Sequence, residues 1–156
     1  MDQTNAIDAK SKLGDIVVAF GYATREAVDE AASRRQQEID ANRDPGLFGG
    51  VLTRGNVCTP EQVAFALDVQ AKLRQTNRLS GNLVALDEKS LIGKILIVLG
   101  FAADDAVEAA FVWQKAERDA GRDPGFIGGI LVTRGVCTAE QRDYGMKVQN
   151  ALRRVS

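Results

Sequence analysis

Residues 13–21 read Leu-Gly-Asp-Ile-Val-Val-Ala-Phe-Gly, and residues 92–100 read Ile-Gly-Lys-Ile-Leu-Ile-Val-Leu-Gly. The second stretch follows the first by about 79 positions. With that offset residues 10–75 align with residues 89–154 without a gap, and about 28 of about 66 aligned positions are identical. A match of this extent indicates an internal duplication. The chain is therefore predicted to have two equivalent lobes, residues 10–75 and 89–154, joined by residues 76–88.

A second, weaker repeat lies inside each lobe. Gly14 and Gly49 start similar segments about 35 residues apart, and the same interval separates Gly93 from Gly128. Each of these four segments has a short apolar run, a residue that favours a helix stop, a turn, and a long stretch with helical spacing. Short helices cannot stand alone, because helix nucleation is costly and their apolar faces need a partner. We therefore predict an all-α fold with two pseudo-equivalent helical lobes, each built from two short-helix/long-helix motifs.

The predicted helix ends rest on capping residues. Thr59 and Thr138 each precede a Glu-Gln pair by the spacing of a capping box. Four residues fall where the short helices must stop, and their types tolerate the left-handed conformation that closes a helix. These residues are Gly21, Asn56, Gly100 and Gly135.

Composition excludes several classes of function. The chain has 156 residues with a net charge of -1, which disfavours a general DNA or RNA coat protein and a polybasic membrane binder. It contains no histidine, which removes imidazole bases and histidine metal ligands. Cys58 and Cys137 lack the paired spacing of a zinc site. We expect no catalytic residues, no metal site and no cofactor.

The sequence also bears on location. The apolar stretch from Ile95 to Leu99 is far shorter than the roughly 20 residues that span a bilayer. The first residues do not combine a basic region with an apolar run, so they do not resemble a secretory signal. We therefore expect a cytoplasmic protein without membrane insertion.

The repeated motif resembles a known family. Leu13-Gly14-Asp15-Ile16-Val17, followed by Gly21, Thr24, Glu26 and Val28, is similar to the helical motif of the MshEN domain, the N-terminal domain of type II secretion and type IV pilus assembly ATPases. The third copy, which begins at Ile92-Gly93, fits this motif best. In that family two successive motifs form one domain, and a subset of members binds cyclic di-GMP. The resemblance implies a tandem pair of such domains without the ATPase motor, and no phosphate-binding loop occurs in the chain.

The candidate ligand-binding residues combine this resemblance with physical reasoning. Free amides at the start of a short helix attract phosphate, and glycine there lets backbone approach a ligand. Arginines can stack on guanine or grip phosphate with two hydrogen bonds. Binding members of the family usually carry arginine before the Leu-Gly pair, where this chain keeps a cation only at Lys12, and a glutamine closes the motif. The predicted ligand-binding residues are Lys12, Leu13, Gly14, Arg35, Arg43, Asp44, Phe48, Gly49, Gln70, Ile92, Gly93, Gln114, Arg122, Asp123, Ile127, Gly128 and Gln149.

Simpler interpretations of the same residues stay open. Glycine in a short helix also permits close helix packing, and Arg-Asp-Pro-Gly is a good turn sequence. Trp113, the only tryptophan, is interpreted as a contact between lobes or with a partner. Our first hypothesis is a non-enzymatic receptor or adaptor module that binds cyclic di-GMP and signals to a protein partner. The alternative is a structural or adaptor protein that docks onto a secretion or pilus machine, or self-associates, without nucleotide.

Overall fold

The computed structural model of the protein describes residues 6–80 and 84–154. Within them the chain forms eight helices, in which short and long helices alternate. The first four are α1 (Leu13–Ala19), α2 (Arg25–Asp40), α3 (Phe48–Arg54) and α4 (Pro60–Ser80), and the next four are α5 (Ile92–Val98), α6 (Asp104–Asp119), α7 (Ile127–Thr133) and α8 (Ala139–Arg153). The prediction of an all-α fold is confirmed.

The predicted capping residues determine where these helices begin and end. All four helix-stopping residues adopt a left-handed conformation, with φ of 73° at Gly21, 57° at Asn56, 84° at Gly100 and 74° at Gly135. The Thr59 hydroxyl accepts a hydrogen bond from the Gln62 amide at 3.1 Å, and the Gln62 side chain accepts one from the Thr59 amide at 2.9 Å. Thr138 and Gln141 make the same reciprocal pair. The helix-end predictions are therefore confirmed.

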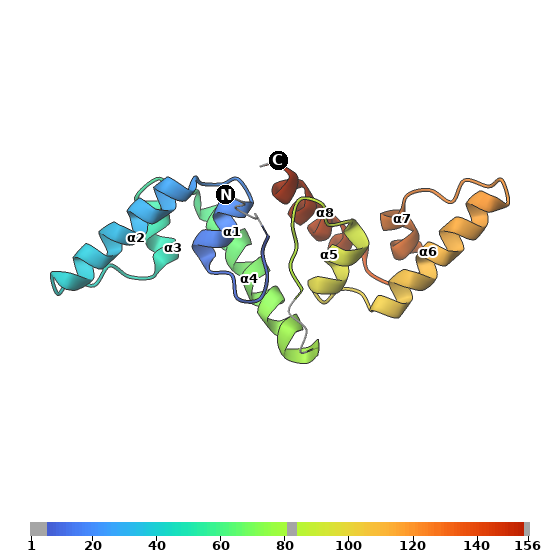
Figure 1. Ribbon diagram of the computed structural model, residues 1–156, viewed down its shortest axis with the longest axis horizontal. Helices are drawn as coiled ribbons and strands as arrows, with labels where there is room; N and C mark the ends of the chain where they lie inside the picture. The colour runs from blue at the N-terminus through green and yellow to red at the C-terminus, as the bar shows by residue number, and fades with distance from the viewer. Residues whose placement is uncertain (1–5, 81–83, 155–156) are drawn as a thin grey trace.

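Helices α1 to α4 pack against one another, as do α5 to α8. The molecule is elongated: α2 and α3 form one end, α6 and α7 form the other, and α1, α4, α5 and α8 lie between them (Figure 1). We refer to residues 13–80 as the first lobe and residues 92–153 as the second lobe. The two grooves described below lie at the two ends of this arrangement.

A single apolar cluster crosses from one lobe to the other. It contains Phe20 and Leu52 of the first lobe together with Leu99 and Leu152 of the second, each at most 3% exposed. Apolar burial is the main stabilising term in folding, so the central helices are joined by core packing. A second cluster, which includes Leu96 and Leu131, fills the space between α5, α6 and α7.

The connection between the lobes differs in detail from the prediction. Helix α4 continues to Ser80, so residues 76–80, expected to belong to the connection, are helical, and residues 81–83 lie outside the described residues. Leu86 then forms an isolated antiparallel bridge with Ile7, and no strand occurs in the described residues. None of the helices within residues 6–80 and 84–154 is both long and apolar enough to cross a bilayer.

Candidate functional site

A groove between α2 and α3 in the first lobe is lined by five charged side chains. Its volume is about 590 Å³, which lies within the range of small-molecule sites. Arg34 and Arg35 enter it from α2, and Arg54 enters it from the last turn of α3. Two carboxylates, those of Glu38 and Asp44, also line this groove. We call this cavity the arginine groove.

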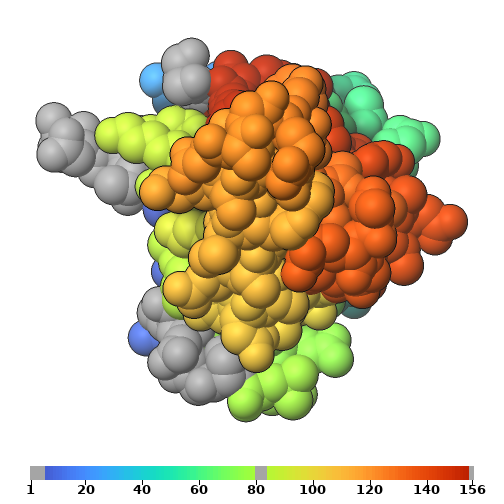
Figure 2. All heavy atoms as spheres, turned by 90° about the vertical axis from the view of Figure 1, so that its right-hand side faces the viewer, coloured from blue at the N-terminus to red at the C-terminus, as the bar shows by residue number. Residues whose placement is uncertain are grey.

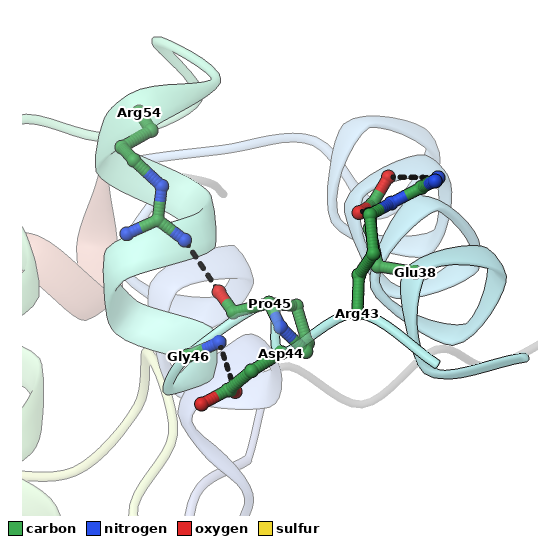
Figure 3. A network of polar contacts seen from close by, with 6 residues as sticks. All are labelled: Glu38, Arg43, Asp44, Pro45, Gly46 and Arg54. Carbon is green, nitrogen blue, oxygen red and sulfur yellow. Dashed lines mark hydrogen bonds and ion pairs between the residues drawn. The ribbon is translucent and has the colours of Figure 1, made fainter. Parts of the chain in front are cut away.

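Backbone carbonyls of the turn between α2 and α3 hold two of these guanidinium groups in place. Arg54 Nη2 donates to the Pro45 carbonyl at 2.5 Å, and Arg35 Nε donates to the Gly46 carbonyl at 3.4 Å. The turn itself is closed by Asp44, whose Oδ1 accepts from the Gly46 amide at 2.9 Å. Figure 3 shows Arg54 pointing from α3 toward Pro45. The Arg-Asp-Pro-Gly turn therefore positions cations that lie outside it.

Arg43 itself points away from these cations. Its Nε and Nη2 donate to the two carboxylate oxygens of Glu38 at 2.5 and 3.1 Å, as Figure 3 shows. The Arg43 hydrogen bonds lower the pKa of the Glu38 carboxyl, and the same contact raises the pKa of the Arg43 guanidinium. The side chain of Arg43 is 64% exposed. Arg43 therefore neutralises a carboxylate of the groove wall instead of extending into the groove.

The second lobe has a smaller groove at the matching place. Its volume is about 330 Å³, and Trp113, Phe126 and Arg134 lie along it. The positions equivalent to Arg34, Arg35 and Arg54 hold Trp113, Gln114 and Thr133. The concentration of arginines is thus a property of the first lobe alone.

Arg122 repeats the contact of Arg43 at the other end of the molecule. It forms a two-point ion pair with Glu117, and Asp123 accepts a hydrogen bond from the Gly125 amide at 3.0 Å. The turns that contain Arg43 and Arg122 follow α2 and α6, which form opposite ends of the molecule (Figure 1). The structure does not bring these two arginines together.

The position that closes the motif holds Gln70, Gln114 and Gln149 in three copies and Arg35 in the first copy, and these four residues share one structural position. Each donates from its long helix to the carbonyl two residues before a short helix. The pairs are Gln70 with Ser11 at 3.0 Å, Gln149 with Ser90 at 3.2 Å, Gln114 with Gly125 at 3.1 Å, and Arg35 with Gly46 at 3.4 Å. Arg35 therefore does what glutamine does in the other copies, and adds a charge.

The predicted glycines at the starts of the short helices lie in helix–helix contacts. A Cβ at Gly14 would lie 2.8 Å from Val28 Cγ1, and one at Gly93 would lie 3.0 Å from Val107 Cγ1. Gly49 and Gly128 lie similarly close to Val63 and Arg142, at 3.0 and 3.3 Å. This contact agrees with the packing interpretation of these glycines.

The remaining predicted residues lie within two positions of these glycines in the sequence. Lys12 is exposed at the residue before α1, where its amide donates to Asp15 Oδ2 at 3.0 Å. Leu13 and Ile92 are buried, and Phe48 and Ile127 are partly buried. In the first lobe Phe48 lies 3.5 Å from the Cβ position of Gly14, and Leu13 lies 3.5 Å from that of Gly49. The first-lobe members of this set therefore meet between α1 and α3.

Two groove residues, Arg34 and Arg54, were missed in the sequence analysis. Neither belongs to the repeated motif, because the second lobe has Trp113 and Thr133 at these positions. In the sequence these two arginines stand out only because the second copy lacks them. The candidate site residues were selected at positions that both copies share. A search for cations present in one copy only would have found both.

Comparison of the chain with family models, with curated proteins and with solved structures finds no match. The resemblance to the MshEN motif therefore stays a prediction that rests on the residues quoted above.

Proposed function

We propose that the protein is a cytoplasmic, non-enzymatic receptor that binds cyclic di-GMP in the arginine groove and signals its presence to a protein partner. The observation that carries this proposal is the convergence of Arg34, Arg35 and Arg54 on one cavity of about 590 Å³. These three guanidinium groups outnumber the two carboxylates of the groove wall, Glu38 and Asp44, and Glu38 is already paired with Arg43. Arg34 pairs with Glu30 at 3.6 Å, whereas Arg35 and Arg54 have no ion pair among the described residues, so the groove offers an excess of positive charge to an anion.

The chemistry of arginine suits a guanine dinucleotide. A guanidinium group forms two parallel hydrogen bonds to a phosphate, and its flat face stacks on a purine. Arg35 and Arg54 are already held by backbone carbonyls, so less side-chain freedom is lost on binding. Arg34, whose contact with Glu30 is a loose 3.6 Å, is free to turn toward a ligand.

The ligand would act on a partner through the α2–α3 turn. A ligand shifts an equilibrium between two conformations only by its difference in affinity for them. Contacts with Arg35 and Arg54 would tie this turn to both helices, because each arginine already bonds a carbonyl of residues 45–46. The ordered turn at the end of the lobe would then be the surface that the partner protein binds.

Isothermal titration calorimetry with cyclic di-GMP tests the proposal. We expect saturable heat for the wild-type protein, and its loss in the double variant Arg34→Ala with Arg54→Ala. Thr133→Ala, at the second-lobe position equivalent to Arg54, is the matched control and should bind normally. GMP and inorganic phosphate as ligands separate recognition of the dinucleotide from simple anion binding. Wild-type protein that gives no heat with cyclic di-GMP, or a double variant that binds as well, contradicts the proposal.

A second candidate is an adaptor that docks onto a secretion or pilus component without nucleotide. Leu47 and Phe126, which directly precede α3 and α7, favour it, because these residues are 83% and 89% exposed. An exposed apolar patch is typical of a contact surface, and each of these two residues borders a groove together with other apolar side chains. Absence of nucleotide heat, together with loss of docking in Leu47→Ser and Phe126→Ser, would favour the adaptor.

A further inference from the structure

Helix α6 exposes an apolar face at the end of the second lobe. Ala109, Val112, Trp113 and Ala116 recur at the spacing that places residues on one side of a helix. All four are exposed, Val112 at 65% and Trp113 at 39%. Phe126 lies on the same groove as Trp113 and is 89% exposed. Figure 2 shows α6 along the front of this end of the molecule, with no other element covering it. We call Ala109, Val112, Trp113 and Ala116 the α6 face.

The packing of the lobe does not require Ala109, Val112 and Ala116 to be apolar, whereas Trp113 also borders the second-lobe groove, where Arg134 lies 5.9 Å from the centroid of its ring. The buried positions of α6 are shared with α2: Val107 and Ala110 correspond to Val28 and Ala31, all at most 4% exposed. The positions of the α6 face are not shared. Their equivalents on α2 are Glu30, Ser33, Arg34 and Gln37, which are all polar. The same helix in the same fold thus has a polar outer face in one lobe and an apolar one in the other, which points to a contact made only by the second lobe.

The charges beside the α6 face are self-complementary. Glu108 and Lys115 lie two turns apart on the same flank, one on either side of Val112 along the helix. Two copies of α6 that cross antiparallel at Val112 bring Glu108 of each copy opposite Lys115 of the other. Glu108 has no ion pair within the described residues, and Lys115 reaches Asp119 only at 4.0 Å while its side chain is 83% exposed. Both side chains are therefore available for a contact across the dyad.

We propose that two copies of this chain associate through antiparallel α6 helices, with Val112 on the twofold axis. Trp113 of each copy packs on Ala109 of the other, since the small side chain leaves room for the indole. A twofold interface uses the same patch on both copies, so a patch whose charges complement themselves fits a second copy of the chain. Asp105 and Asp119 meet at the rim of this interface, where solvent screens their repulsion. The arginine groove, at the opposite end of each copy, stays free.

Sedimentation equilibrium of the full chain tests this proposal independently of nucleotide binding. We expect the wild-type protein to dimerise and Val112→Glu to be monomeric with an unchanged circular dichroism spectrum. The matched control is Ser33→Glu, the equivalent position on α2, which should dimerise like the wild type. A wild-type protein that is monomeric at high concentration overturns the proposal. In that case a different protein would be the binding partner of the α6 face. A folded Val112→Glu variant that still dimerises also overturns it.

A charge exchange tests the antiparallel register. Glu108→Lys alone and Lys115→Glu alone should each weaken dimerisation by about tenfold or more, because each creates two like-charge contacts in the dimer. The double variant should recover dimerisation, because both ion pairs are restored with reversed sign. A merely structural role of either residue would leave the double variant as weak as the single ones, and that result overturns the register.

Discussion

Ile7 and Leu86 exchange a reciprocal pair of backbone hydrogen bonds, each with an N···O distance of 2.7 Å. Both side chains are fully buried, and the two residues are separated by the repeat interval of the sequence. Phe65 and Tyr144, separated by the same interval, also meet, with ring centroids 5.2 Å apart. Residues one repeat interval apart thus contact each other at the centre of the molecule, within the apolar cluster that both lobes share.

The shared core predicts that the lobes unfold together. Leu52→Ala removes a fully buried side chain of the first lobe and should lower the free energy of unfolding by about 2–4 kcal/mol. Trp113, the only tryptophan, reports on the second lobe. The thermal midpoint followed by its fluorescence should fall together with that followed by circular dichroism. A fluorescence midpoint that stays unchanged in Leu52→Ala would mean that the lobes unfold independently.

The contact between the lobes predicts a dependence of stability on pH. Tyr144 Oη donates to Asp68 Oδ2 at 2.6 Å, and this hydrogen bond holds the pKa of the Asp68 carboxyl below its usual value. A carboxyl with a lowered folded-state pKa adds stability above its unfolded pKa of about 3.9, and that stability is lost as the pH falls through the folded value.

Tyr144→Phe should therefore lower the free energy of unfolding by about 1 kcal/mol near neutral pH, since the Asp68 side chain is half exposed. The difference from the wild type should shrink as the pH falls below about 4. Urea denaturation at a series of pH values measures both effects. Curves that stay parallel down to acid pH would show that the hydrogen bond does not stabilise the ionised carboxylate.

The helix contacts at the short-helix glycines predict opposite effects at two glycines. Gly14→Ala places a Cβ 2.8 Å from Val28 Cγ1 and should destabilise the protein by about 1–3 kcal/mol. Gly129→Ala, inside α7, meets no atom within 4 Å and should be neutral or stabilising by up to about 1 kcal/mol through helix propensity. Thermal denaturation of both variants compares them directly. Equal effects would contradict the packing role of Gly14.

A glutamine at position 35 should keep the hydrogen bond to the Gly46 carbonyl and remove only the positive charge. Arg35→Gln copies the residue found at Gln114, keeps a donor for the Gly46 carbonyl and should change stability by less than about 0.5 kcal/mol. It removes one of the three groove cations, so it should weaken cyclic di-GMP binding. Gln114→Ala, which loses a buried hydrogen bond, should cost about 1–2 kcal/mol. An Arg35→Gln variant that binds like the wild type would remove this residue from the site.

The repetition of the sequence predicted the helices well and the site only in part. Helix ends followed from local chemistry, as at Gly21 and Thr59, so the pattern alone located them. The arginine groove depends on how α3 turns Arg54 back toward Pro45, a tertiary contact with no local signature. Arg43 was selected because it is repeated, but a repeated arginine five residues after a repeated glutamate forms a local ion pair. Residues that differ between the copies were the better indicators of the groove.

A crystal structure of the protein with cyclic di-GMP tests the proposed function most directly. We expect the nucleotide between α2 and α3 of the first lobe, with phosphate or guanine atoms in hydrogen-bond contact with Arg34 and Arg54, and no nucleotide in the groove beside Trp113. Nucleotide bound elsewhere, with the arginine groove empty at saturating concentration, would contradict it.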